Sequence, residues 1–217
     1  LSLLYVGARL VARIAMVSER EARGHLKDLY AEIKAGMGTP NVPTVFRVMS
    51  QSPELLEANW RLYQTMMLAD SQLPRATKEM IAVVVSKANS CNYCVTAHSI
   101  FLKGLGHSNQ QIKDCTERIE AADLAPSIRA LLDFAEKVTL DAGHIQDEDV
   151  QVLTALGFSE GQVLEAASVV GFFNGINRLV AALDVEPDLM MKVGVRLPPP
   201  LVRRVVKTSN REGAKSG

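Results

Sequence analysis

Apolar residues recur at helical spacing along most of the chain, and alternating apolar and polar stretches bounded by hairpin turns are nearly absent. This pattern predicts an all-α protein, a multi-helix bundle. A capping box of Ser18 and Glu21 predicts a first helix from residue 18 to about Ala35, ended by Gly36. The apolar face of this helix carries Leu26, Leu29, Tyr30 and Ile33.

Two further helices are predicted from their start signals. Ser52 as N-cap, Pro53 as first residue and Glu54 in the first turn predict a helix that ends near Asp70. Pro74 precedes a third helix, whose apolar residues cover most of its circumference, so we expect it to be largely buried. Residues 38–43 contain two prolines and an asparagine, which predicts a loop.

The remaining helices follow from interruptions and stop signals. Asn89 and Ser90 interrupt the third helix, and Ser90 is the expected N-cap of a helix that ends at residues 103–104. Later helices are predicted over about residues 126–142, 147–156 and 160–183.

Two segments can be laid over each other. Residues 105–112 and 156–163 both read Leu-Gly-x-Ser-x-x-Gln-apolar, which suggests an internal repeat of a helix-turn-helix unit. Helix capping alone is enough to produce the match, so duplication and chance both stay open. If the repeat is real, only its first copy carries cysteines.

Composition limits the function classes. Lys plus Arg and Asp plus Glu number 24 each, so no overall charge favours nucleic acid or an anionic membrane. No uncharged apolar run reaches the roughly 18 residues that a membrane span requires. Three cysteines, one far from the others, do not form the disulfide framework of a secreted protein. We therefore expect a cytoplasmic protein that binds neither nucleic acid nor membranes.

The chain is expected to have three parts. Residues 1–17 are read as an N-terminal extension, because this apolar stretch carries two arginines and lacks a convincing cleavage site. Residues 18–190 are the helical domain. Residues 191–217 are a C-terminal tail, which we expect to be partly mobile because its last residues are rich in Ser, Gly and charge.

Cys91, Cys94 and His98 are the strongest candidates for chemistry. Residues three and four apart on a helix are neighbours, so the two thiols face each other and His98 lies one turn beyond Cys94. A helix start and a nearby imidazolium both lower the pKa of a thiol. We hypothesise that Cys94 is the attacking thiol and that Cys91 resolves its oxidised form as a disulfide.

Other interpretations of the same residues stay open. Zinc needs four ligands, and Cys91, Cys94, His98 and the distant Cys115 could nominally supply them, but there is no second CxxC or HxxxH pair. We expect neither a metal nor another cofactor. The two cysteines could also be small core residues. Covalent haem attachment is excluded, because Val95 stands where CxxCH requires histidine.

Glu79 lies in the first turn of the buried third helix. A buried carboxylate needs a partner, and His98 is the expected one. Desolvation would raise the pKa of Glu79 towards that of a base, so that it could relay a proton through His98 to Cys94. The alternative is an exposed glutamate that only stabilises the start of the helix. Asn174 and Asn177, polar residues in an apolar helix, receive no role.

Glu79, followed twelve residues later by Cys91-x-x-Cys94-x-x-x-His98, resembles the active-site signature of the alkylhydroperoxidase D (AhpD) family, within the carboxymuconolactone decarboxylase superfamily. The resemblance extends over about residues 38–185 and is greatest to the peroxidase-related branch. It implies an all-α fold and homo-oligomers, either trimers or hexamers built as dimers of trimers.

The resemblance also implies an activity, which is the reduction of hydroperoxides with electrons from a dithiol such as a lipoylated protein. It gives Cys94 the peroxidatic role, Cys91 the resolving role, and Glu79 with His98 a proton relay. Well-studied members have histidine immediately before the second cysteine, where this chain has Tyr93. The alternative function is a redox-sensing or partner-binding helical oligomer with little turnover.

Overall fold

A computed structural model describes residues 12–117 and 124–188 of the chain. These residues form helices and contain no strand, so the predicted all-α class is confirmed. Predictions for residues 1–11 and for the tail at 191–217 lie outside the described residues. The elements in chain order are α1 (Gly24–Met37), α2 (Thr44–Arg47), α3 (Pro53–Tyr63), the π-helical turn η1 (Gln64–Leu68), α4 (Arg75–Ala88), α5 (Asn92–Gly104), α6 (Asn109–Glu117), α7 (Pro126–Asp141), the 3-10 turn η3 (Ala142–His144), α8 (Asp147–Ala155) and α9 (Glu160–Leu183).

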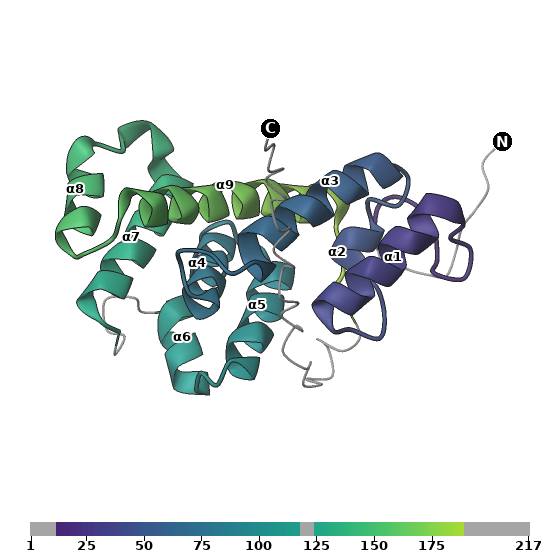
Figure 1. Cartoon of the computed structure of the whole chain (residues 1–217), viewed down its shortest axis with the longest axis horizontal. Coiled ribbons are helices and arrows are strands. Elements are labelled where there is room, and N and C mark those ends of the chain that lie inside the picture. Colours follow the sequence, from purple (N-terminus) through teal and green to yellow (C-terminus); the bar gives the residue numbers. More distant parts are fainter. Residues whose placement is uncertain (1–11, 118–123, 189–217) are drawn as a thin grey trace, which may run out of the picture.

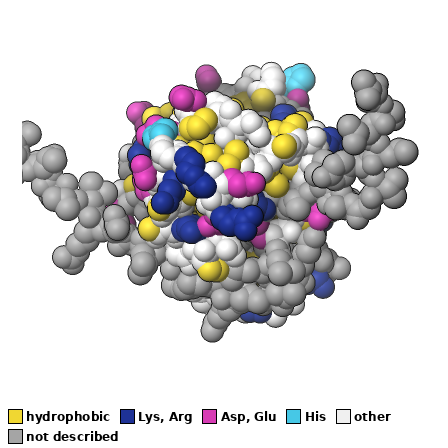
Figure 2. Space-filling view, turned by 90° about the vertical axis from the view of Figure 1, so that its right-hand side faces the viewer, with side chains coloured by type: hydrophobic (Ala, Val, Ile, Leu, Met, Phe, Trp, Pro, Cys, Tyr) yellow, Lys and Arg dark blue, Asp and Glu magenta, His cyan; other side chains and the backbone are white. Residues whose placement is uncertain are grey.

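The longest helix, α9, runs along the long axis of the molecule (Figure 1). Helices α7 and α8 lie at one end of it, α1 and α2 lie at the other, and α4, α5 and α6 lie beneath its middle. Figure 2 views the molecule from the end that carries α1, where basic and acidic side chains lie next to each other. That mixture agrees with the balanced net charge of the chain.

Helix α4 is the centre of the core. It packs against α5, α7 and α9, and every side chain from Thr77 to Ser86 is buried, as the apolar circumference of this segment predicts. The buried Lys78 is satisfied, because its ammonium donates to Ser71 Oγ at 2.7 Å and to the carbonyl of Ala69 at 3.2 Å. The buried Glu79 belongs to the candidate site.

The first helix differs from the prediction at both ends. Ser18 and Glu21 do exchange capping bonds, with Ser18 N 3.2 Å from the Glu21 carboxylate, but they close a turn, and α1 begins only at Gly24. The helix also continues through Gly36 to Met37 and ends at Gly38, which has a φ of 64°. The expected limits were therefore wrong, although the predicted apolar face is buried.

A close approach from α3 explains why glycine stands inside α1. A Cβ at position 36 would lie 2.6 Å from the indole of Trp60, which is fully buried. Phe46 also holds the indole, because its ring meets that of Trp60 edge-on at a centroid distance of 5.5 Å. Gly36 thus marks a packing contact, and the stop signal is Gly38.

The other predicted helices agree well with the structure. Ser52 caps α3 by accepting the amide of Leu55 at 3.3 Å, with Pro53 as the first helical residue. Helices α7, α8 and α9 occupy the three predicted segments of the second half. The short helix α2 follows the loop at residues 38–43. It was not predicted, because four residues are too few to show a helical periodicity.

The two matching segments adopt the same turn. Gly106 and Gly157 have φ angles of 98° and 95°, and Ser108 and Ser159 cap the following helices with Gln111 and Gln162. The first residues of α4 and α7 (75 and 126) are also as far apart in the sequence as the first residues of α6 and α9 (109 and 160). These similarities support the internal repeat, which stays a prediction.

By length and composition, α9 is the helix among the described residues that could cross a membrane. Packing accounts for most of its apolar face, since eight apolar residues between Val163 and Val180 are buried in the core, although Leu164 is exposed. The segment before α1 reaches the end of this helix, where Arg13 N donates to the carbonyl of Leu183 at 2.7 Å.

Gly36→Ala should destabilise the protein. Alanine favours a helix by about 1 kcal/mol over glycine, but overpacking against the buried indole costs roughly 1–3 kcal/mol and rigid neighbours cannot yield. Chemical denaturation should therefore show a lower free energy of unfolding. Gly171→Ala is the matched control, because nothing lies within 4 Å of a Cβ there, and it should be neutral or stabilising. Equal effects of the two changes would contradict the packing contact.

Candidate active site

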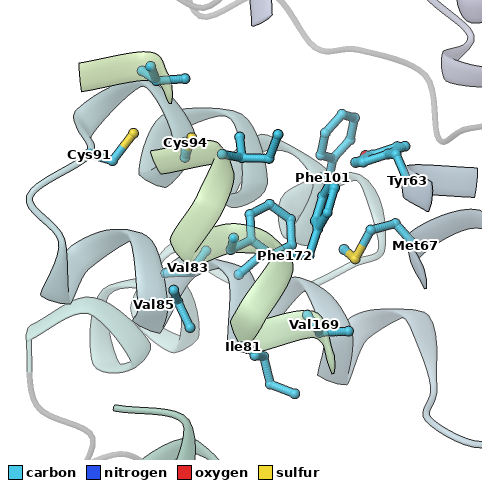
Figure 3. Close-up of a cluster of buried hydrophobic side chains, with 14 of the residues drawn as sticks. Tyr63, Met67, Ile81, Val83, Val85, Cys91, Cys94, Phe101, Val169 and Phe172 are labelled. Carbon is cyan, nitrogen blue, oxygen red and sulfur yellow. The ribbon is translucent and has the colours of Figure 1, made fainter. Parts of the chain in front are cut away.

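Cys91 and Cys94 lie at the first turn of α5, next to each other at one end of the buried cluster in Figure 3. Both are unpaired and buried, with exposed fractions of 5% and 2%. Cys91 is the N-cap residue, so the prediction that Ser90 is the N-cap was wrong. Ser90 instead adopts a φ of 56°, and this turn lets Cys91 N donate to Ser86 O at 2.8 Å. The end of α4 therefore fixes the start of α5.

Polar side chains from α4 and α9 surround the two thiols. The amide of Asn177 hydrogen-bonds to both cysteines, and Ser86 hydrogen-bonds to Cys94. Asn177 is itself held in place, since its Nδ2 donates to Ser86 Oγ at 3.0 Å and its Oδ1 accepts from Asn89 at 3.0 Å. The sequence offered one signal for this residue, which was a polar side chain inside an apolar helix.

The pKa values of the two thiols are shifted in opposite directions. The side chain of Cys94 hydrogen-bonds to Cys91 and, although burial opposes it, lowers the pKa of Cys91 to about 7, with help from the Cys94 backbone amide and Asn177. The pKa of Cys94 is raised by its bond to Cys91, by burial and by the charge of Cys91. We had expected the lowered pKa at Cys94. The pair therefore gives up its first proton near neutral pH and holds the second.

Glu79 and His98 make the expected contact. The Glu79 Oε2 lies 2.5 Å from His98 Nδ1, and the carboxylate is fully buried. Its other oxygen accepts from Arg75 Nε at 2.5 Å, one turn earlier on α4. His98 is also held by Phe173, whose ring meets the imidazole edge-on at a centroid distance of 4.6 Å. With Nδ1 engaged, Nε2 is the ring nitrogen left for other partners.

The pKa of Glu79 contradicts the prediction. Burial alone would raise it, but the charges and hydrogen bonds of His98 and Arg75 outweigh burial and lower it. The prediction did not include Arg75, whose guanidinium is the second cationic partner of Glu79. Glu79 therefore remains a carboxylate that holds His98, and it is poorly suited to act as a base.

A cavity of about 240 Å³ opens beside these residues. Cys94 and His98 lie on its wall, whereas Cys91 does not. Its remaining lining is mostly apolar, including Phe46 from α2, Phe101 from α5 and Phe172 from α9. Among the two thiols, Cys94 is thus the one that a small molecule in this cavity would meet.

Tyr93 stands between the cysteines, where well-studied AhpD proteins have histidine. Its hydroxyl donates to Asp188 Oδ2 at 2.8 Å and accepts the amide of Val45 at 3.2 Å. Burial raises the pKa of Tyr93, and the adjacent charge of Asp188 raises it further. Tyr93 therefore ties the first turn of α5 to α2 and to the segment after α9, and it does not exchange protons near neutral pH.

The described residues contain no group of three or more His, Cys, Asp or Glu side chains placed to hold a metal ion. Cys115, the fourth ligand that zinc would need, lies on α6. Burial raises the pKa of this thiol to about 11, with a further contribution from Asp114. Cys115 is therefore an inert core residue at neutral pH.

Comparison with known proteins shows which family this site resembles. The family model for the carboxymuconolactone decarboxylase family matches residues 53–137, which include all four predicted site residues and Arg75. This part of the chain is therefore similar to that family. The resemblance inferred from Glu79 and the Cys91 to His98 segment is thereby confirmed.

Two solved structures resemble this chain over most of its length. A peroxidase-related protein with an AhpD core from Ralstonia eutropha is 26% identical, with a TM-score of 0.78, and the match covers 90% of this chain and 100% of that one. A peroxidase-related protein from Silicibacter is 29% identical, with a TM-score of 0.76, over 86% of this chain and 97% of that one. The AhpD-like fold is thus shared along nearly the whole chain.

A curated relative carries a functional name. The alkyl hydroperoxide reductase Rv2159c of Mycobacterium tuberculosis is 31% identical over 101 residues. The match covers 46% of this chain and only 28% of that protein, so the chain corresponds to about a quarter of the relative's length.

Glu79→Gln should destabilise the protein at pH 7 by about 3 kcal/mol, because it breaks a buried ion pair and leaves its partners uncompensated. The folded-state pKa of Glu79 lies below its unfolded value, so the stabilisation is complete above the unfolded pKa of 4.5 and is lost as the pH falls through the folded one. Denaturation at several pH values should show the difference from wild type narrowing in acid. Asp28→Asn, at an exposed position, is the control and should change little. A difference that is constant with pH would contradict the ion pair.

Proposed function

We propose that the protein is a thiol-dependent peroxidase of the alkylhydroperoxidase type, which reduces hydroperoxides through a Cys91/Cys94 disulfide cycle. The observation that carries the proposal is a pair of hydrogen-bonded thiols, of which Cys94 lies with His98 on the wall of one cavity. The relative named alkyl hydroperoxide reductase and the two peroxidase-related structures support the same reaction class.

The first step consumes the peroxide. The resting pair carries its charge on Cys91, so the remaining proton of Cys94 passes to Cys91 along their hydrogen bond as Cys94 attacks. The sulfur of Cys94 bonds to one peroxide oxygen while the O–O bond breaks. The other oxygen leaves with the bonding electrons and takes up a proton, which yields an alcohol and a sulfenic acid on Cys94.

The second step closes the disulfide. The sulfur of Cys91 attacks the sulfenic acid, the S–O bond breaks, and the hydroxyl leaves as water after taking up a proton. Two thiols and one hydroperoxide thus give one disulfide, one alcohol and one water. A dithiol, such as a protein-bound lipoyl group, then returns two electrons and two protons and regenerates the pair.

Glu79 and His98 act as a unit in this proposal. The carboxylate of Glu79 holds Nδ1 and so directs Nε2 to the cavity side, where His98 can give a proton to the leaving oxygen. The lowered pKa of Glu79 favours this orienting role over that of a terminal base. In this proposal His98 transfers the proton, and Glu79 orients His98 instead of serving as the base that the sequence predicted.

Assembly and location belong to the proposal as well. We propose a homo-oligomer, a trimer or a hexamer built as a dimer of trimers, in the reducing cytoplasm. Leu140 and Leu164 support burial against another copy, because each large apolar side chain is about two thirds exposed, at 65% and 69%. A cytoplasmic location agrees with two neighbouring cysteines that are unpaired.

The test is a count of thiols after treatment with a small excess of cumene hydroperoxide. The wild type should lose two of its three thiols, Cys94→Ser should lose none rapidly, and Cys91→Ser should accumulate a sulfenic acid that dimedone traps at Cys94. Cys115→Ser is the matched control and should still lose two. Retention of all free thiols under excess peroxide would refute the proposal.

Turnover separates this function from the redox-sensing alternative. Repeated cycles with dihydrolipoamide as electron donor support a peroxidase. A single oxidation that changes the oligomeric state, with no further peroxide consumed, would instead support a sensor.

A further inference from the structure

The wall of the cavity carries polar atoms that have no hydrogen-bond partner. Nε of Arg47 and Oγ1 of Thr39 are both buried and unpaired, and both residues line the same cavity as Cys94 and His98. Buried polar groups in folded proteins are nearly always hydrogen-bonded, so two unpaired donors on one cavity wall call for an explanation. A ligand with an acceptor group would supply it.

Arg47 is also an unpaired charge. The described residues give its side chain no ion pair and no hydrogen bond. Glu19 is close enough for the two charges to interact, but its carboxylate oxygens already bind Lys34 Nζ at 2.6 Å and the amide of Val42 at 2.7 Å. The guanidinium of Arg47 therefore keeps its capacity for a carboxylate.

The other charges of the cavity are already engaged. Asp188 lines the cavity, but its oxygens accept the amide and hydroxyl of Thr44 and the hydroxyl of Tyr93. The imidazole of His98 is held by Glu79 on the side of Nδ1. Arg47 is thus the charged group of the cavity that is left without a partner in the described structure.

Most of the cavity is apolar. Aromatic and aliphatic side chains from the loop before α2, from α5 and from α9 make up its walls, among them Val42, Phe101 and Ile176. Such a surface binds an apolar body, whereas an isolated cation and a hydroxyl bind an anion. The two properties together specify an amphipathic ligand.

We propose that this cavity takes hydroperoxides with an aromatic or aliphatic body and a carboxylate, and that Arg47 and Thr39 bind the carboxylate. The peroxide group of this substrate class rests on the proposed function, but the carboxylate site does not. Arg47 would determine specificity through binding, and the reacting atoms would remain with Cys94 and His98.

The experiment compares two matched substrates, cumene hydroperoxide and its para-carboxylate. With dihydrolipoamide as donor, the wild type should prefer the carboxylate in kcat/KM. Arg47→Gln should lower kcat/KM for the carboxylate about tenfold, chiefly through KM, and leave the neutral substrate within about twofold. Arg47→Lys should recover part of the preference, and Arg20→Gln, at an exposed position, is the control that should change neither substrate.

Binding of unreactive analogues keeps the two proposals distinguishable. Calorimetry should show that the wild type binds 4-(2-hydroxypropan-2-yl)benzoate more tightly than the neutral 2-phenyl-2-propanol, and that Arg47→Gln removes the difference. If binding behaves in this way but no hydroperoxide is turned over, the carboxylate site stands and the peroxidase proposal fails. Equal binding of the two analogues, or equal losses for both in Arg47→Gln, would overturn the carboxylate site.

Discussion

The ion pair between the carboxylate of Glu79 and its two partners is the interaction on which the site depends. Glu79 lies on α4, whose side chains from Thr77 to Ser86 are all buried, and an unpaired carboxylate there would cost several kcal/mol. Arg75 one turn earlier and His98 on α5 make burial tolerable, and together they keep the carboxylate ionised. Since His98 belongs to the helix that carries the cysteines, this pair also fixes α5 against α4.

The same principle governs the other polar groups of the core. Lys78 donates to Ser71 and to the carbonyl of Ala69, and Asn177 binds Ser86 and Asn89 while it contacts the thiols. Each of these buried polar groups thus has hydrogen-bond partners within the fold. Preorganisation of this kind is what a thiol pair needs to hold a shared charge near neutral pH.

How far the sequence could predict this arrangement depended on the range of each interaction. Capping residues act within one turn, so Ser52 and Ser159 correctly predicted where α3 and α9 begin. Gly36 was misread as the end of α1, because its glycine is required by a tertiary contact with Trp60 and the helix ends at Gly38. Spacing on one helix correctly indicated that Cys91 and Cys94 are neighbours, and Cys94 shares a cavity wall with His98. The family resemblance pointed to Glu79.

What the sequence could not supply were contacts between distant segments. The link from Tyr93 to Asp188 spans 95 residues, and the placement of Arg47 on the same cavity as Cys94 results from packing of α2 against α5 and α9. The direction of the Glu79 pKa was within reach, because Arg75 stands four residues before it. The guanidinium of Arg75 adds a second cation beside Glu79, and with His98 it outweighs the effect of burial on the Glu79 pKa.

The central claim is that the shared proton gives the cysteine pair one thiolate near neutral pH, and a titration of thiolate absorbance near 240 nm tests it most directly. The protein with Cys115 replaced by Ser should gain the absorbance of one thiolate with a pKa of about 7, and the second thiol should stay protonated well above that pH. Replacing Cys94 by Ala should raise the pKa of Cys91, because the side-chain donor is lost. A first ionisation at or above the ordinary thiol value of about 8.5 in the otherwise intact pair would contradict the account.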